Sequence, residues 1–152
     1  MACLDRIELY QHGKPLGLRD AYELLAAKRD NFASRFATYC LLRQKGFVVH
    51  SGINYGTDFV LYRKDPDLVH AEHSVVVLDA DDRNFTWRTA VGINRSCASA
   101  KKTLLIASVK KNPSSKNEED ALESFVKDYD IQLVKMTRWI PEESRQQAQG
   151  DK

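Results

Sequence analysis

The spacing of apolar residues changes near residue 46, from a helical period to an alternating or continuous one. Ahead of that point, Ile7 to Tyr10 alternates apolar and polar positions and runs into a turn that contains Gly13 and Pro15, so we expect a short strand or hairpin. The stretch from Leu18 to Gly46 then predicts two helices, with Asp30 or Asn31 as the cap of the second and Gly46 as its stop. The second helix has apolar residues at i, i+4, i+7 and i+8, namely Phe32, Phe36, Tyr39 and Cys40.

Beyond residue 46 the sequence predicts a β-sheet. Five segments are rich in β-branched and aromatic residues and are bounded by turn residues: Phe47–Val49, Phe59–Tyr62, Ser74–Leu78, Leu104–Val109 and Ile131–Val134. Between the third and the fourth, Thr86–Ser99 has the spacing of a helix, whose inward residues are expected to be Trp87, Ala90, Val91 and Ile93. A further helix is predicted over Glu118–Lys127.

The predicted fold class is α+β, a mixed α/β arrangement in which a mixed sheet of five strands is flanked by helices. We expect an N-terminal helical and hairpin part over residues 1–46, an α/β part over residues 47–140 and a frayed tail over residues 141–152. Because few helices cover this sheet, one edge or face should need a partner, so oligomerisation is expected.

Composition and charge narrow the class without identifying a partner. The 152 residues are 43% hydrophobic and 29% charged, which suits one globular unit and excludes disorder, collagen or a coiled coil as a description of the whole chain. No apolar run approaches the roughly 20 residues of a spanning helix, so we expect neither membrane insertion nor export. Three widely spaced cysteines predict a reducing compartment. A net charge of +2 is too small to indicate a nucleic acid.

The densest group of polar and titratable residues lies between Asn54 and His73, across a predicted strand and the loop that follows it. Tyr62 at the strand end and His70 beyond the turn could meet on one face, although the residues alone favour an amphipathic strand position and a surface histidine. A metal site is disfavoured, because neighbours on a strand face opposite ways and no thiol is near. It would use His70, Glu72, His73 and the acids Asp79, Asp81 and Asp82. We expect no metal and no other cofactor.

Four separated blocks of sequence carry a resemblance to a known family. They are Gly52–Lys64 (GINYGTDFVLYRK), His70–Val75 (HAEHSV), the stretch from Arg95 to Ile106 that contains Lys102-Thr103-Leu104-Leu105, and Thr137-Arg138-Trp139. In this order and at this spacing they resemble the catalytic domain of the tRNA-splicing endonuclease family, the tRNA-intron lyases, and most of all its catalytic subunits of the Sen2 type. The resemblance extends from about Phe32 to Trp139.

The resemblance implies which residues carry the chemistry. The catalytic tyrosine, histidine and lysine of the family fall on Tyr62, His70 and Lys102, and a shift by one residue would select Lys101 instead. Two arginines that hold an extruded bulge base in the active site of a facing subunit fall on Arg95 and Arg138, and Trp139 is expected to contact RNA beside them. The plainer alternative is a helix-end charge at Arg95 and a surface stack of Arg138 on Trp139.

These three residue types can cut RNA without a metal, because the substrate supplies its own nucleophile. The 2′-hydroxyl attacks the adjacent phosphorus, so the protein needs only a base, an acid and a cation. Free imidazole has a pKa of about 6.5 and suits the acid, whereas a free phenol titrates near 10 and needs a cation nearby to act as the base. The products would be a 2′,3′-cyclic phosphate and a 5′-hydroxyl.

The expected function is an endoribonuclease subunit that cuts precursor tRNA at intron–exon junctions. The alternatives are a non-catalytic architectural subunit of the same complex, an RNA- or DNA-binding module and a metal-dependent nuclease. Two splice sites require two active sites at a fixed separation, so we expect a dimer, or the heterotetramer with other subunits that the resemblance implies. The compartment is expected to be the nucleus in a eukaryote and the cytoplasm in an archaeon.

Overall fold

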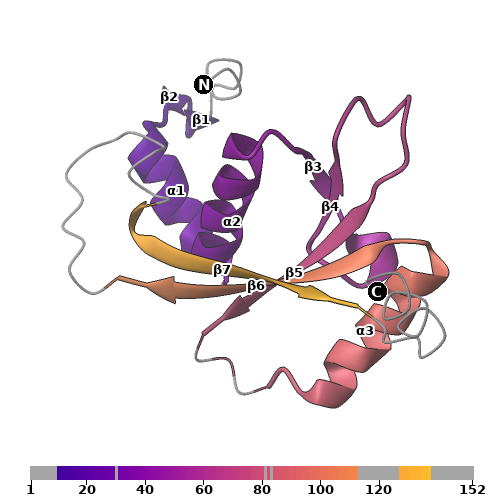
Figure 1. Ribbon diagram of the computed structural model, residues 1–152. Coiled ribbons are helices and arrows are strands. Elements are labelled where there is room, and N and C mark those ends of the chain that lie inside the picture. Colours follow the sequence, from indigo (N-terminus) through magenta and orange to yellow (C-terminus); the bar gives the residue numbers. More distant parts are fainter. Residues whose placement is uncertain (1–9, 30, 81, 83, 113–126, 138–152) are drawn as a thin grey trace, which may run out of the picture.

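A computed structural model describes residues 10–29, 31–80, 82, 84–112 and 127–137 (Figure 1). None of the helices in these ranges is long and apolar enough to cross a membrane. The elements in chain order are β1 (Tyr10–Gln11), β2 (Lys14–Pro15), α1 (Leu18–Ala26), α2 (Phe32–Gln44), β3 (Val48–Ser51), the 3-10 helix η1 (Ile53–Tyr55), β4 (Phe59–Tyr62), β5 (His73–Asp79), α3 (Trp87–Ser99), β6 (Thr103–Lys111) and β7 (Tyr129–Met136). The predicted α+β class is confirmed. The predicted tail and almost all of the predicted helix over residues 118–127 lie outside the described residues.

One mixed sheet contains five strands in the order β3-β4-β5-β6-β7. Strands β5 and β6 run parallel, from the pair His73 and Thr103 to the pair Asp79 and Val109. The other neighbours are antiparallel. A parallel pair needs a crossover connection, which α3 supplies. The five predicted strands are therefore confirmed, each close to its expected bounds.

The two faces of the sheet pack against different helices (Figure 1). On one face Leu42 of α2 packs with Leu61, Val75 and other buried residues of the sheet. On the other face Cys97 of α3 packs with Val76 and Leu104. Because side chains alternate along a strand, the even-numbered residues of β4, β5 and β6 face α3 and the odd-numbered residues face α2.

Helix α2 ends where the sequence predicts. Gly46 takes a left-handed φ of +87°, a conformation that glycine adopts readily. Its N–H donates to the carbonyl of Arg43 at 3.0 Å, and the N–H of Phe47 donates to the carbonyl of Leu42 at 3.2 Å. These two bonds form a Schellman motif, which satisfies the last carbonyls of the helix and directs the chain into β3.

Two residues predicted to face the core from α3, Trp87 and Val91, do not. Val91 is not among the described residues that pack on the sheet, and it lines a hollow on another face of the helix. Trp87 is 75% exposed, whereas Ala90 is buried and Ile93 packs on the sheet. The stripe that faces the sheet runs through Ala90, Ile93 and Cys97. Phe85, which precedes the helix, covers the end of that stripe. The first residue of the helix is therefore left in solvent, and the predictions for Trp87 and Val91 were wrong.

Candidate active site

The ends of three neighbouring strands bring Tyr62 and Lys102 to the same side of the sheet. Leu61 pairs with His73, and His73 pairs with Thr103. Tyr62, Glu72 and Lys102 therefore stand in a row, one position beyond these pairs. Neighbouring strands lie about 4.8 Å apart, so the backbones of Tyr62 and Lys102 are about 10 Å apart along the row. Residues two apart on a strand point to the same face of the sheet. Tyr62 therefore shares the face of Val60, and Lys102 shares the face of Leu104, which is the face covered by α3.

The ring of Tyr62 lies against a histidine of the edge strand. Val48 of β3 pairs with Tyr62, and His50 points to the same face two residues further on. The rings of His50 and Tyr62 have their centroids 5.4 Å apart and meet edge to face at 63°. Tyr62 is half-buried and His50 is exposed. The phenol ring is thus in contact with the His50 imidazole and remains partly exposed.

The backbone at Lys102 is held by a second Schellman motif, at the end of α3. Lys101 takes the left-handed φ of +53°. Its N–H donates to the carbonyl of Ala98 at 3.0 Å, and the N–H of Lys102 donates to the carbonyl of Cys97 at 2.8 Å. Thr103 then joins the sheet, because its N–H donates to the carbonyl of Glu72 at 2.9 Å. This geometry places Lys102, and not Lys101, in the row with Tyr62.

His70 lies in the loop that leads from Tyr62 back to β5. Arg63 and Glu72 close the base of this loop, since Arg63 Nε donates to Glu72 Oε2 at 2.8 Å. His70 is exposed, and its imidazole makes no hydrogen bond or ion pair with the residues that the structure describes. The loop that carries this imidazole leaves the sheet after Tyr62 and returns to it beside Glu72.

His73, the neighbouring histidine, faces the other side of the sheet. Its ring packs edge-on against Phe47, with the centroids 6.3 Å apart, and Phe47 belongs to the core under α2. Burial lowers the pKa of His73 below the ordinary value of imidazole, and the nearby Glu72 carboxylate acts in the opposite direction. The strand predicted over Ser74–Leu78 begins one residue earlier, at His73. His73, packed on the α2 side, does not point into the row.

The turn between β3 and β4 forms a firm support beside the row. The carbonyl of Gly52 accepts hydrogen bonds from the N–H of Tyr55 at 2.9 Å, the N–H of Thr57 at 3.2 Å and Thr57 Oγ1 at 3.1 Å. Gly56 ends η1 with a left-handed φ of +68°. Sequence reasoning placed Gly52 and Tyr55 in a family block without giving either a role; the signal available was the pair of glycines flanking a three-residue turn.

Asp58 ties this turn to both layers of the fold. Its Oδ1 pairs with Arg35 of α2, and its Oδ2 accepts a hydrogen bond from the N–H of Val77 in β5 at 2.7 Å. Its own N–H donates to the carbonyl of Val75 at 2.9 Å. Both side chains of the ion pair are largely buried, so the pair is not a surface contact that solvent screens. Asp58 thereby anchors the start of β4, the strand that ends at Tyr62.

Gly52→Ala is expected to lower the free energy of unfolding by about 2 to 3 kcal/mol, because overpacking of a closed site displaces backbone. A Cβ at Gly52 would lie 2.3 Å from Thr57 Oγ1 and 2.9 Å from the backbone of Phe59. The matched control is Gly92→Ala in α3, where a Cβ meets no atom within 4 Å. There the change should stabilise the helix by about 0.5 to 1 kcal/mol. Urea unfolding measures both, and equal effects in the two variants would contradict the prediction.

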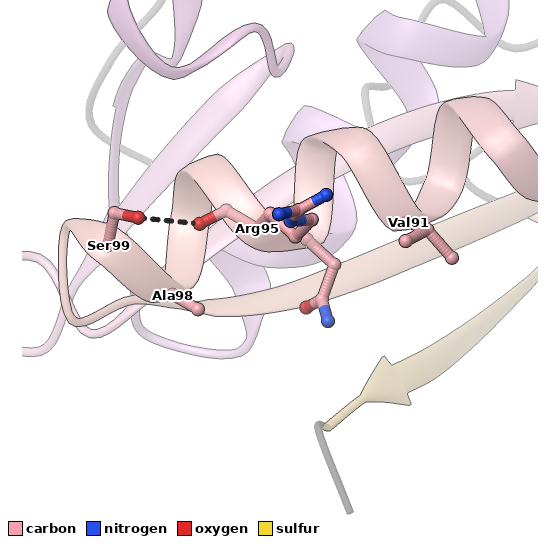
Figure 2. Close-up of a pocket in the computed structure, with 5 residues that line it drawn as sticks. Val91, Arg95, Ala98 and Ser99 are labelled. Atoms are coloured by element: carbon pink, nitrogen blue, oxygen red, sulfur yellow. Dashed lines mark hydrogen bonds between the residues drawn. The ribbon is translucent and has the colours of Figure 1, made fainter.

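Arg95 lies on a face of α3 other than the stripe that packs on the sheet. Figure 2 shows Val91, Arg95, Ala98 and Ser99 along this face, where Ser99 Oγ donates to the carbonyl of Arg95 at 3.0 Å. Together with Asn94 they line a hollow of about 740 Å³. Arg95 is exposed. Arg138 and Trp139, the other residues predicted to bind RNA, lie outside the described residues.

Potential metal ligands do not gather in the part of the chain that the structure describes: there, no group of three or more His, Cys, Asp or Glu is placed to hold an ion. The Glu72 carboxylate is paired with Arg63, and His73 packs on the α2 side of the sheet. The candidate site consists of a phenol at the end of β4, an ammonium group just before β6 and an imidazole in the loop between β4 and β5.

Comparison with known proteins gives matches over the same region. The family model of the tRNA intron endonuclease catalytic C-terminal domain matches residues 32–116. The chain is 31% identical over 152 residues to tRNA-splicing endonuclease subunit Sen2 of Gallus gallus, covering 95% of this chain and 32% of the relative. It is 38% identical over 128 residues to subunit Sen2-2 of Arabidopsis thaliana, covering 84% and 50%. It is 36% identical over 99 residues to the tRNA-splicing endonuclease of Saccharolobus solfataricus, covering 65% and 54%.

The chain thus spans about a third to a half of the length of the curated relatives that it matches. The region matched by the family model contains Tyr62, His70, Arg95 and Lys102. It runs from the start of α2 to beyond the end of β6 and so includes both helices that cover the sheet. A match over more than half of its residues shows that the chain belongs to the tRNA intron endonuclease family.

Proposed function

We propose that this chain is an endoribonuclease subunit that cleaves precursor tRNA at intron–exon junctions. The observation that carries the proposal is the row at one end of the sheet, where Tyr62 and Lys102 face α3 and the loop with His70 connects Tyr62 to Glu72. Relatives that match this region are named tRNA-splicing endonuclease or subunits of it. Family membership and the residue types in the row support the same activity.

The three side chains are available to a substrate. Among the described residues, no hydrogen bond or ion pair is made by the Tyr62 hydroxyl, the His70 imidazole or the Lys102 ammonium. Tyr62 and Lys102 are half-buried and His70 is exposed, so no hydrogen bond or ion pair within the described residues has to break before RNA contacts these side chains.

The reaction proposed is an in-line transesterification within the RNA. The Tyr62 phenolate takes the proton of the 2′-hydroxyl, and the 2′-oxygen forms a bond to the adjacent phosphorus. The bond from phosphorus to the 5′-oxygen breaks, and the His70 imidazolium gives a proton to that oxygen. The Lys102 ammonium stabilises the negative charge that grows on the non-bridging oxygens. One fragment ends in a 2′,3′-cyclic phosphate and the other in a 5′-hydroxyl.

Arg95 suits a different task, because it lines a separate hollow along α3 that contains none of Tyr62, His70 and Lys102. We propose that Arg95 and Arg138 together bind an unpaired base from the bulge at a splice site. That base would be held in the active site of a facing subunit. Flat guanidinium groups can stack on both faces of such a base, and RNA recognition commonly targets bases outside the stack. This assignment requires a dimer or a heterotetramer with other subunits. The compartment would be the nucleus in a eukaryote and the cytoplasm in an archaeon.

Cleavage of an RNA helix with two three-base bulges should proceed in excess EDTA at a rate within about twofold of that with Mg²⁺, because no step uses a metal. The protein is tested alone and with candidate partner subunits, its mass is measured by light scattering, and the new ends are identified chemically. Cyclic phosphate and 5′-hydroxyl ends at both bulges are expected. Dependence on Mg²⁺ or 5′-phosphate ends would contradict the mechanism, and binding without cleavage would indicate an architectural subunit.

A further inference from the structure

A lysine side chain that acts on a phosphate must be held in position by a neighbouring group. The ammonium group sits on a flexible four-carbon stem, and that freedom must be restricted if the charge is to be aimed at a phosphate before the reaction starts. Lys102 Nζ has no hydrogen bond or ion pair with the residues that the structure describes. Its contact is with an aromatic ring, since Nζ lies 4.8 Å from the centroid of Tyr55. This distance is within the range of a cation–π interaction.

The Glu72 carboxylate could form an ion pair with the Lys102 ammonium, but it already pairs with Arg63. Glu72 stands between Tyr62 and Lys102 in the row, but its carboxylate accepts a hydrogen bond from Arg63 at 2.8 Å. An ion pair with Glu72 would cancel the charge of Lys102. A neutral ring attracts the ammonium through its quadrupole and leaves the full positive charge for the substrate. A ring is therefore the more suitable partner for a cation that must act on phosphate.

Both partners of this contact are fixed by local hydrogen bonds. The backbone of Lys102 is held by the Schellman motif that ends α3. The ring of Tyr55 projects from η1, whose two ends are held by Gly52 and Gly56. Tyr55 and Lys102 are both half-buried. Two short, rigid segments far apart in the sequence therefore meet at this pair.

We propose that Tyr55 is a positioning residue that holds the Lys102 ammonium at the phosphate site through its ring face. The inference rests on the proposed function, because it gives Tyr55 a task only if Lys102 acts on RNA. Tyr55 itself touches no reacting atom. The ring is the essential part, and the hydroxyl is not.

The test compares Tyr55→Phe and Tyr55→Leu by single-turnover cleavage of the bulged RNA at saturating and subsaturating protein. Phenylalanine keeps the ring face and should cut within about twofold of the wild type. Leucine removes it and should slow the bond-breaking step by about 5- to 30-fold, the range that loss of a cation–π contact predicts, with little change in the concentration for half-saturation. In the Lys102→Met background, Tyr55→Leu should cost nothing further.

NMR of the same two variants tests the contact between Tyr55 and Lys102 independently of RNA cleavage. The side-chain protons of Lys102 next to its ammonium should show an upfield ring-current shift in the wild type and in Tyr55→Phe, and lose it in Tyr55→Leu. If the shift is present but the wild type never cuts RNA, the proposed function fails, and the positioning role fails with it. If the wild type cuts, the inference alone is overturned by a Tyr55→Leu variant at full rate, or by an equal loss in the Lys102→Met background.

Discussion

His70→Ala is expected to slow cleavage of the bulged RNA by about 10²- to 10⁴-fold, the range that a general acid contributes. The free energy of unfolding should change by less than about 0.5 kcal/mol, as surface substitutions usually do. The reason is that the imidazole is exposed and has no hydrogen bond or ion pair with described residues. Single-turnover rates and urea unfolding of the two proteins measure these quantities.

A substrate with sulfur as the leaving atom separates an acid from a residue that only shapes the loop. A thiolate leaves without protonation, so RNA with a 5′-bridging sulfur at the cleavage site should bring His70→Ala to within about tenfold of the wild type. The same RNA should not rescue Tyr62→Phe, which lacks the base.

The matched control is His73→Gln, which alters a histidine on the α2 side of the sheet and should cut at nearly the wild-type rate. The same loss in both histidine variants, or no rescue by sulfur, would contradict the role of His70.

The elements of this fold were predictable where a local pattern determines them. Strand β4 has the predicted bounds, because four β-forming residues stand between turn residues. The stop of α2 was predictable because Gly46 readily takes the left-handed conformation there. The orientation of Trp87 was not predictable from the helical period alone, because Phe85 lies outside the helix and covers the same end of the core. The helical period identifies the apolar stripe of a helix but does not show which residues outside the helix cover the ends of that stripe.

The candidate site was predictable as a set of residue types and not as a geometry. The resemblance selected Tyr62 and His70 but left Lys101 and Lys102 as alternatives, because the sequence does not show where α3 ends. Lys101 takes a backbone conformation usually filled by glycine or asparagine, so no local signal marked the Schellman motif that moves it out of the row. The contact of Tyr55 with Lys102 joins two distant segments through tertiary packing. A one-dimensional pattern contains no information about such a pair.

Lys102→Met is expected to reduce the single-turnover rate by about 10²- to 10³-fold, as removal of one group that stabilises transition-state charge typically does. Methionine keeps an unbranched stem of similar shape and removes the charge. The loss should appear in the rate at saturating protein, because the ammonium acts on charge that grows only as the phosphorus bond forms. The concentration for half-saturation should change much less.

Lys101→Met is the matched control, and it should keep the rate within about threefold of the wild type, as for a change at an exposed helix cap. The two lysines are adjacent, so either change lowers the net charge by one and weakens long-range attraction for RNA equally. They differ in position, since Lys102 stands in the row and Lys101 occupies the left-handed cap. Equal losses, confined to affinity, would mean that both act only through long-range charge. A larger loss in Lys101→Met would transfer the electrostatic role to that residue and remove Tyr55 from the mechanism.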